Sequence, residues 1–162
     1  MFHILIVSYN NCFIIKEGVE KKIDIIDEFW IFTFDGIPLF TYSPKQKEND
    51  IIISGFLSAV QKFCYQMNPD EHRFINSLTL GEYLFNFLID HKYQLFFVSK
   101  SSDEVSPKKI NKYLKDIQEG FTNQFDEAIQ NFEGEISVFE KFKPEFQKIY
   151  DGGLFQKLKR LL

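Results

Sequence analysis

The sequence contains few of the residues that build disulfide or metal-bound scaffolds. Two cysteines, Cys12 and Cys64, and three dispersed histidines occur among its 162 residues. Neither set has the spacing of a zinc site, and the two cysteines provide no disulfide framework. The cysteine usage favours a reducing compartment, so we expect a cytoplasmic protein.

The sequence also lacks the motifs that carry common chemistry. Neither GxxxxGK[ST] nor GxGxxG occurs, so no loop is predicted to cradle phosphates. The segment "PDEHR", Pro69 to Arg73, gathers an acid, a histidine and an arginine, but it is predicted to be a solvated turn. The formal net charge of −4 disfavours a nucleic-acid-binding surface. We predict a protein that is not an enzyme and uses no cofactor or metal.

Long apolar segments are missing as well. No stretch approaches the roughly 20 apolar residues of a membrane span. The N-terminal run "FHILIVSYNNCFII" is interrupted by Asn10-Asn11 and lacks the basic region and cleavage site of a signal peptide. We therefore expect a soluble chain without a signal peptide.

Aromatic residues are abundant by contrast. They make up 17% of the sequence and include 20 phenylalanines, within a hydrophobic content of 44%. A chain of this length and composition can bury a substantial core in one compact domain. We expect the phenylalanines to fill that core rather than to line a pocket.

The segment "FWIFTFDGIPLFTYSP" predicts a β-hairpin. Phe29 to Phe34 and Ile37 to Tyr42 are strand-like and flank a two-residue Asp35-Gly36 turn. The first strand is apolar on both faces, so it is predicted to lie inside the sheet with helices on both sides. Pro38 has no N–H group, which places the second strand at an edge.

A helix is predicted from Asn49 to Met67. Apolar residues recur along it at helical spacing: Ile52, Phe56, Ala59, Val60, Phe63 and Met67. Further apolar residues widen that surface: Ile51, Ile53, Leu57 and Cys64. Such a wide apolar surface indicates packing against more than one neighbour. An N-terminal hairpin of the same chain and a partner protein are both open as that second neighbour.

Three strand-like runs follow and predict an antiparallel meander: Phe74 to Leu80, Tyr83 to Ile89 and Tyr93 to Ser99. Pro107 is suited to open a second helix, which the apolar spacing carries to about Asn131.

A third helix is predicted close to the C-terminus. Ser137 and Glu140 match a capping box at its start, and Pro144 is expected to kink or restart it. Asp151-Gly152-Gly153 is expected to end it.

These elements predict an α+β fold: a five-stranded antiparallel sheet with one helix on one face and two on the other. Ahead of it, Phe2 to Ser8 and Cys12 to Lys16 predict an extra β-hairpin, with Glu17 to Asp27 as a connector. We divide the chain into an N-terminal extension (1–27), a domain (28–150) and a basic amphipathic tail (151–162).

The order of these elements resembles the longin domain, a profilin-like or SNARE-like fold related to the roadblock family. The resemblance covers about Glu28 to Tyr150, and its texture is similar to longin and roadblock proteins of archaea related to eukaryotes. Four segments carry it: "FWIFTFDGIPLFTYSP", "SGFLSAVQKF", "INSLTLGEYLFNFLIDHKYQLFFVSK" and "FEGEISVFEKF". Roadblock proteins usually begin with a helix, whereas a hairpin is predicted here, so the longin family is preferred.

The resemblance implies a non-catalytic scaffold that forms homodimers or heterodimers with another longin or roadblock domain. It also implies binding or regulation of a small Ras-like GTPase in a trafficking-like or signalling assembly. The edge strand and the helix predict the interface residues: Ile37, Leu39, Thr41, Ile51, Ile53, Leu57 and Gln61. The alternative is a small-molecule or lipid-sensing profilin-like domain, which requires a cavity among the aromatic residues.

The C-terminal segment "LFQKLKRLL" predicts a short amphipathic helix with basic flanks. Its residues form a candidate surface for a partner or for peripheral membrane contact: Leu154, Phe155, Lys157, Leu158, Lys159, Arg160 and Leu161. Nine residues are few for an independent helix, so docking on the protein itself or on a partner is the preferred interpretation.

Overall fold

A computed structural model describes the backbone of residues 4–8, 11–16, 19–22, 26–44, 49–67, 73–102 and 105–159, and the side chains within 26–44, 49–67, 73–101 and 105–152. Its main sheet is antiparallel with the strand order β5-β4-β8-β7-β6. The strands are β4 (Glu28–Thr33), β5 (Pro38–Tyr42), β6 (Ser77–Leu80), β7 (Tyr83–Asp90) and β8 (Leu95–Ser102).

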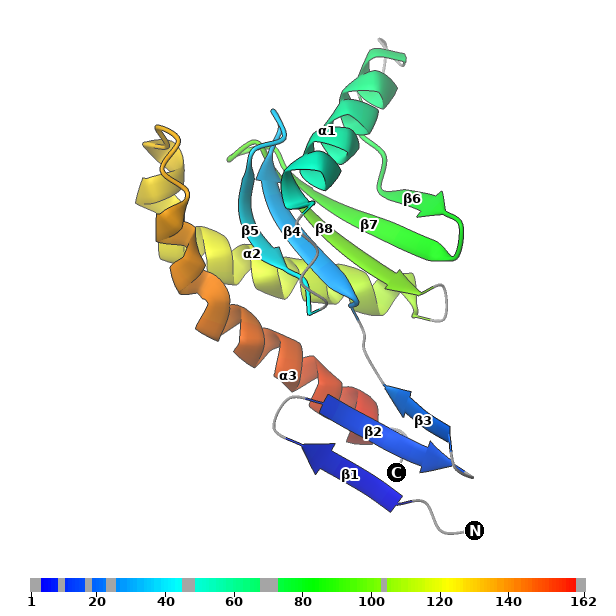
Figure 1. Ribbon diagram of the computed structural model, residues 1–162. Helices are drawn as coiled ribbons and strands as arrows, with labels where there is room; N and C mark the ends of the chain where they lie inside the picture. The colour runs from blue at the N-terminus through cyan, green and yellow to red at the C-terminus, as the bar shows by residue number, and fades with distance from the viewer. Residues whose placement is uncertain are drawn as a thin grey trace.

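Helices cover both faces of this sheet. Helix α1 (Asp50–Met67) lies on one face, and α2 (Pro107–Gln130) and α3 (Lys143–Lys159) lie on the other, joined by a short 3₁₀-helix, η1 (Ser137–Phe142) (Figure 1). Alternate residues of β4 serve the two layers: Phe29 packs in the α2/α3 cluster, and Trp30 packs in the α1 cluster. The predicted α+β fold is confirmed.

The hairpin that opens the sheet differs from the prediction in its turn. The amide of Gly36 donates to Thr33 O (2.8 Å) and that of Thr33 donates to Ile37 O (3.0 Å), so the loop has three residues, and Phe34 belongs to it. Gly36 has φ +86°, the left-handed conformation that such a loop requires at its last position.

Strand β5 lies at the edge of the sheet, as Pro38 predicted. Phe32 lies opposite Pro38 and Ile31 lies opposite Phe40, so Leu39 is the extra residue of a β-bulge. Both Leu39 and Phe40 consequently pack in the α2/α3 cluster.

The C-terminal helices depart from the predicted boundaries. Helix α3 continues through Gly152 to Lys159, so the expected break at Asp151-Gly152-Gly153 is wrong. Glycine costs a helix about 1 kcal/mol relative to alanine and does not by itself end it. Pro144 occupies the first turn of α3, where its missing N–H leaves no intrahelical bond unmade.

The capping box predicted at Ser137 is wrong. Ser137 caps no helix; its backbone N–H donates to the Glu135 carboxylate at 2.9 Å. A Cβ atom on Gly120 would lie 3.4 Å from Ile149 Cδ1 and 3.6 Å from Phe142 Cε2, which is ordinary van der Waals contact, so the packing of α2 does not require glycine there.

The N-terminal region forms a separate three-stranded antiparallel sheet: β1 (Ile4–Ser8), β2 (Asn11–Lys16) and β3 (Val19–Lys22). Strands β1 and β2 form the expected hairpin. Strand β3 lies in the segment predicted as a connector, where Val19 to Lys22 pair with β2. The side chains of all three strands lie outside the described residues, and so do any contacts between them and α1.

Candidate interaction surface

The inner face of α1 is polar and small. Ser54, Ser58 and Gln61 are buried, and Leu57 is the only large apolar residue buried on this helix. The Ser54 hydroxyl donates to Gly36 O (3.0 Å) and the Ser58 hydroxyl donates to Phe34 O (2.6 Å). These hydroxyls satisfy carbonyl groups of the β4–β5 turn that would otherwise lie under the helix without a donor.

The turn and the helix approach each other closely. A Cβ atom on Gly36 would lie 3.2 Å from Gly55 Cα and 3.3 Å from Ser58 Cβ. A side chain at position 36 would therefore push the turn away from the helix, whereas a Cβ atom on Gly55 would meet no atom within 4 Å. This close approach decides which face of α1 turns inward.

Gln61 holds a second segment against the same face. Its side-chain amide donates to Ile75 O and accepts from Ile75 N–H, both at 2.9 Å. These two hydrogen bonds have the pattern of a hydrogen-bonded residue pair in an antiparallel sheet. They fix the segment that leads into β6. At the start of the helix, Trp30 Nε1 donates to Asp50 Oδ1 (3.2 Å).

The outer face of α1 is apolar and open. We call it the α1 stripe and define it as Ile52, Phe56, Ala59, Phe63 and Met67. These residues follow the spacing i, i+4, i+7, i+11 and i+15 along one side of the helix. The large side chains of the α1 stripe are between 50% and 70% exposed, and neighbouring Ile51 is 75% exposed.

The α1 stripe is an exception to the usual burial of apolar spacing. Apolar residues at helical spacing usually mark the buried face of a helix, and these residues do not. They face outward, since the inner position is taken by residues that can both approach the turn closely and donate to its carbonyls. The spacing identified the stripe but did not show which way it faces.

The α1 stripe carries no charge. The helix contains two charged residues, Asp50 and Lys62. The Asp50 carboxylate accepts from Trp30, and Lys62 Nζ lies 2.9 Å from Asp35 Oδ1. An uncharged apolar strip more than two helical turns long is typical of a surface that binds a protein.

The predicted interface residues are distributed over both faces. Ile51 (75%) and Ile37 (43%) are exposed, while Thr41 and Ile53 are partly exposed. Leu39, Leu57 and Gln61 are buried within their own chain. Sequence reasoning named each residue of the α1 stripe but did not predict that the stripe is exposed.

A groove runs beside the edge strand β5. Its volume is about 670 Å³, and its walls come from the start of α1 on one side and from η1 and the start of α3 on the other. The lining residues are Pro38, Leu39, Phe40, Thr41, Asp50, Ile51, Ile136, Glu140 and Lys143.

The floor of the groove offers backbone groups. Phe34 N–H donates to Gln94 O, at the end of β4 that leads into the turn. Because the bonding direction alternates from one residue to the next, every second residue counted back from Phe34 directs its N–H and C=O toward β8, and Trp30 is one of them. Thr41 lies opposite Trp30 and therefore directs its own N–H and C=O to the open side of β5.

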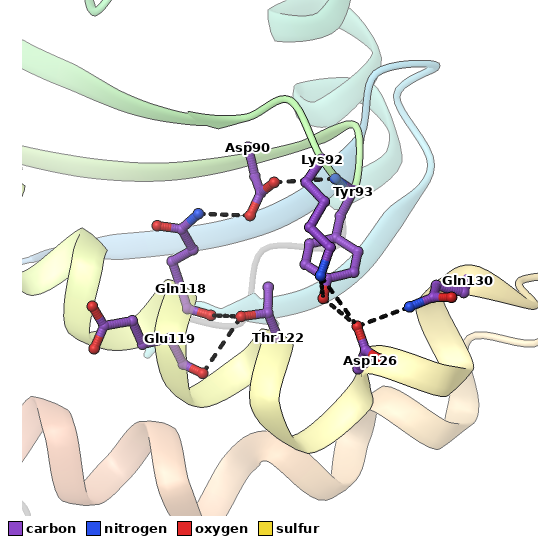
Figure 2. Close-up of polar contacts among 8 residues, drawn as sticks. All are labelled: Asp90, Lys92, Tyr93, Gln118, Glu119, Thr122, Asp126 and Gln130. Carbon is purple, nitrogen blue, oxygen red and sulfur yellow. Dashed lines mark hydrogen bonds and ion pairs between the residues drawn. The ribbon is translucent and has the colours of Figure 1, made fainter.

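A polar network ties the β7–β8 turn to α2 (Figure 2). Asp90 accepts from the Tyr93 amide (3.1 Å) and from Gln118 Nε2 (2.6 Å), and the Tyr93 hydroxyl donates to Asp126. The hydroxyl of Tyr93 lowers the pKa of the Asp126 carboxyl and raises the pKa of Lys92 from their ordinary values. These bonds hold the β7–β8 turn against α2, and this structural role accounts for the network.

Within the described residues, no group of three or more His, Cys, Asp or Glu side chains could hold a metal ion. None of the helices in that part of the chain is long and apolar enough to cross a membrane. The backbone of α3 includes Leu154 to Lys159, whereas the side chains of the predicted tail lie outside the described residues.

Comparison with known proteins bears on the fold. No family model matches the sequence, and no curated protein matches it. Among solved structures, the mammalian SRP receptor has 16% identity and a TM-score of 0.53, and the match covers 83% of this chain and 98% of that chain. A Roadblock/LC7 domain from Streptomyces avermitilis has 7% identity and a TM-score of 0.47, covering 58% of this chain and 83% of that one. The chain therefore shares its fold with the matched chain of the mammalian SRP receptor.

Proposed function

We propose that this protein is a non-catalytic interaction scaffold of longin type that dimerises through the α1 stripe. The proposal extends to a small Ras-like GTPase, which the scaffold binds or regulates in a trafficking-like or signalling assembly. The main support for the proposal is the orientation of α1, whose apolar face is turned to solvent and whose polar face is turned to the sheet. Exposing four large apolar side chains in a row has a solvation cost that binding a partner removes.

A second copy of the chain fits the α1 stripe well. In an antiparallel pair of helices, Phe56 would lie beside Phe63 of the other copy, and Ile52 beside Met67, around a common centre near Ala59. Small Ala59 permits close approach of the two helices. The face has no charge, so self-association brings no like charges together.

The expected dimer is weak. A helix of 18 residues is about 27 Å long and about 10 Å wide, so an α1 pair buries on the order of 500 Å² in total. Stable dimers bury about 1,200 Å² or more. We therefore expect a concentration-dependent equilibrium between monomer and dimer.

Sedimentation velocity over a wide concentration range tests the dimer. The double variant Phe56→Asp/Phe63→Asp places two carboxylates in the α1 stripe and should remain monomeric throughout. The matched control, Asn111→Asp/Asn123→Asp, adds the same charge to the exposed face of α2 and should associate like the unmodified protein. A strict monomer at every concentration, or equal association of both variants, would contradict the role of α1.

The GTPase requires a separate measurement. Small GTPases of the host, each loaded with GDP or with a GTP analogue, are tested for binding to the unmodified chain and to the α1 double variant. Binding of one GTPase supports the scaffold whether or not the dimer forms. If no GTPase binds in either nucleotide state, the proposed GTPase partner is excluded, and the dimer result is unaffected.

The small-molecule alternative receives less support. The aromatic residues that would have to enclose a ligand pack on one another, with Phe34 and Phe96 centroids 4.5 Å apart and Phe121 and Phe142 centroids 5.1 Å apart. The groove beside β5 lies at the edge of the sheet, and Phe40 is the one aromatic residue among those that line it.

A further inference from the structure

Four lysines gather on the solvent side of α2 near its N-terminus. Lys108, Lys112 and Lys115 follow the spacing i, i+4 and i+7, and Lys109 flanks them. All four side chains are exposed, and the opposite side of the same turns is buried against the sheet and α3. We call these four residues the lysine stripe.

None of the four lysines of the stripe is held in an ion pair within the described part of the chain. Ion pairs join Lys62 to Asp35, Lys92 to Asp126, Lys100 to Glu28 and Lys148 to Glu145. The four lysines of the stripe form no ion pair with any described residue, although Asp116 and Glu119 lie four positions after Lys112 and Lys115.

The start of α2 gains nothing from this placement. The first turn of α2 contains no acidic residue and two lysines, Lys108 and Lys109, where the partial positive charge of the helix end opposes a cation. Lys108 and Lys112 are also like charges at i and i+4, an arrangement that destabilises a helix. Positive charge concentrated at this end of the helix, in a chain of net charge −4, indicates an external anionic partner.

We propose that the lysine stripe docks the protein on an anionic lipid surface. Clusters of four or more basic residues on one side of a helix bind membranes that contain anionic lipid. Interfaces between proteins are poor in lysine and rich in aromatic residues, whereas the only aromatic residue in these turns, Tyr113, is buried. Single-stranded nucleic acid would need exposed aromatic side chains for stacking, and the stripe has none.

The position of the stripe is compatible with the proposed dimer. Helix α2 covers the face of the sheet opposite to α1 (Figure 1). A lipid surface held against α2 therefore leaves the α1 stripe accessible. Membrane docking in this form does not depend on the dimer or on the GTPase, and it can succeed or fail without them.

Vesicle sedimentation tests the proposal. Neutral phosphatidylcholine vesicles are compared with vesicles that also contain about 30% phosphatidylserine, at low and high salt. We expect the full chain to bind the anionic vesicles alone, and added salt to weaken the binding. Replacing all four lysines of the stripe by glutamine should reduce binding by up to about fivefold per residue. Replacing all four by arginine should preserve it.

A matched control separates local charge from net charge. The variant Lys62→Gln/Lys92→Gln/Lys141→Gln/Lys143→Gln removes four exposed lysines elsewhere and changes the net charge equally. It should bind anionic vesicles like the unmodified chain. Equal loss of binding in both glutamine variants overturns the proposal, and so does equal binding of the unmodified chain to neutral vesicles.

Two further readouts exclude other roles for the lysine stripe. A purely structural role predicts that the glutamine variant of the stripe unfolds at lower urea concentration, whereas our reasoning predicts equal or greater stability. A short DNA duplex serves as a soluble polyanion. If the chain binds the duplex through the same lysines and does not bind the vesicles, the partner is a nucleic acid and the proposal is wrong.

Discussion

Replacing Gln61 by methionine tests whether the polar inner face of α1 holds the fold together. Gln61 is fully buried and exchanges two hydrogen bonds of 2.9 Å with the backbone of Ile75. Methionine has a similar length and fills the same space, but it cannot donate to Ile75 O, and its sulfur is only a weak acceptor for Ile75 N–H.

The expected loss follows from the two bonds. Each contributes about 0.5–1.5 kcal/mol net, and leaving a buried group without a partner adds to that. Both bonds are partly buried, so we expect the free energy of unfolding to fall by about 2–4 kcal/mol. For a chain of this size the unfolding temperature should fall by roughly 4–16 °C.

Urea unfolding followed by far-ultraviolet circular dichroism measures this change, and an unchanged slope against urea shows that the comparison is valid. The matched control is Gln66→Met, which alters an exposed glutamine of the same helix and should change stability by less than about 0.5 kcal/mol. If the two variants are equally stable, Gln61 does not anchor the segment before β6. If Gln61→Met weakens dimer association and leaves the free energy of unfolding unchanged, Gln61 is an interface residue.

Two other perturbations address the charged groups. Lys100→Met should lower the free energy of unfolding by about 3–5 kcal/mol, because Glu28 is 4% exposed and loses its 2.8 Å ion pair. Urea unfolding measures the loss, and Lys92→Met, which breaks an exposed ion pair with Asp126, is the control. Equal losses in the two variants would contradict the prediction. Asp126 accepts from the Tyr93 hydroxyl, which lowers its pKa in the folded state, so its contribution is present above the ordinary aspartate pKa of about 3.9 and lost as pH falls through the folded value. The stability difference between Asp126→Asn and the unmodified chain should therefore shrink on acidification, and a constant difference would refute it.

Much of the fold could be predicted from local signals. The Asp35-Gly36 pair marked the hairpin, and Pro38 marked the edge strand, because positive φ and a missing N–H restrict where these residues occur. The loop length was wrong by one residue, since Phe34 has the composition of a strand and only its hydrogen bonds place it in the turn. The expected helix break at Gly152 was wrong because glycine lowers helix stability without setting an end.

The candidate site could be predicted only in part. Apolar periodicity found the residues of the α1 stripe, but it did not show that they are the ones that face outward. The lysines of α2 were visible in the sequence, yet the side of the helix they occupy and their lack of counter-charges depend on the packed structure. Buried Gln61 gave no local signal, because its partner Ile75 is fourteen residues away.

The sequence by itself determined the strands and helices of the main domain, their order and the edge of the sheet, because each depends on backbone restrictions of a few neighbouring residues. Tertiary structure alone decided which face of α1 is inside. That choice depends on carbonyl groups of a turn eighteen and twenty-four residues away, which accept from Ser54 and Ser58 and lie close under the helix at Gly36. Burying the small polar side satisfies those carbonyls, and the apolar side is thereby left for a partner.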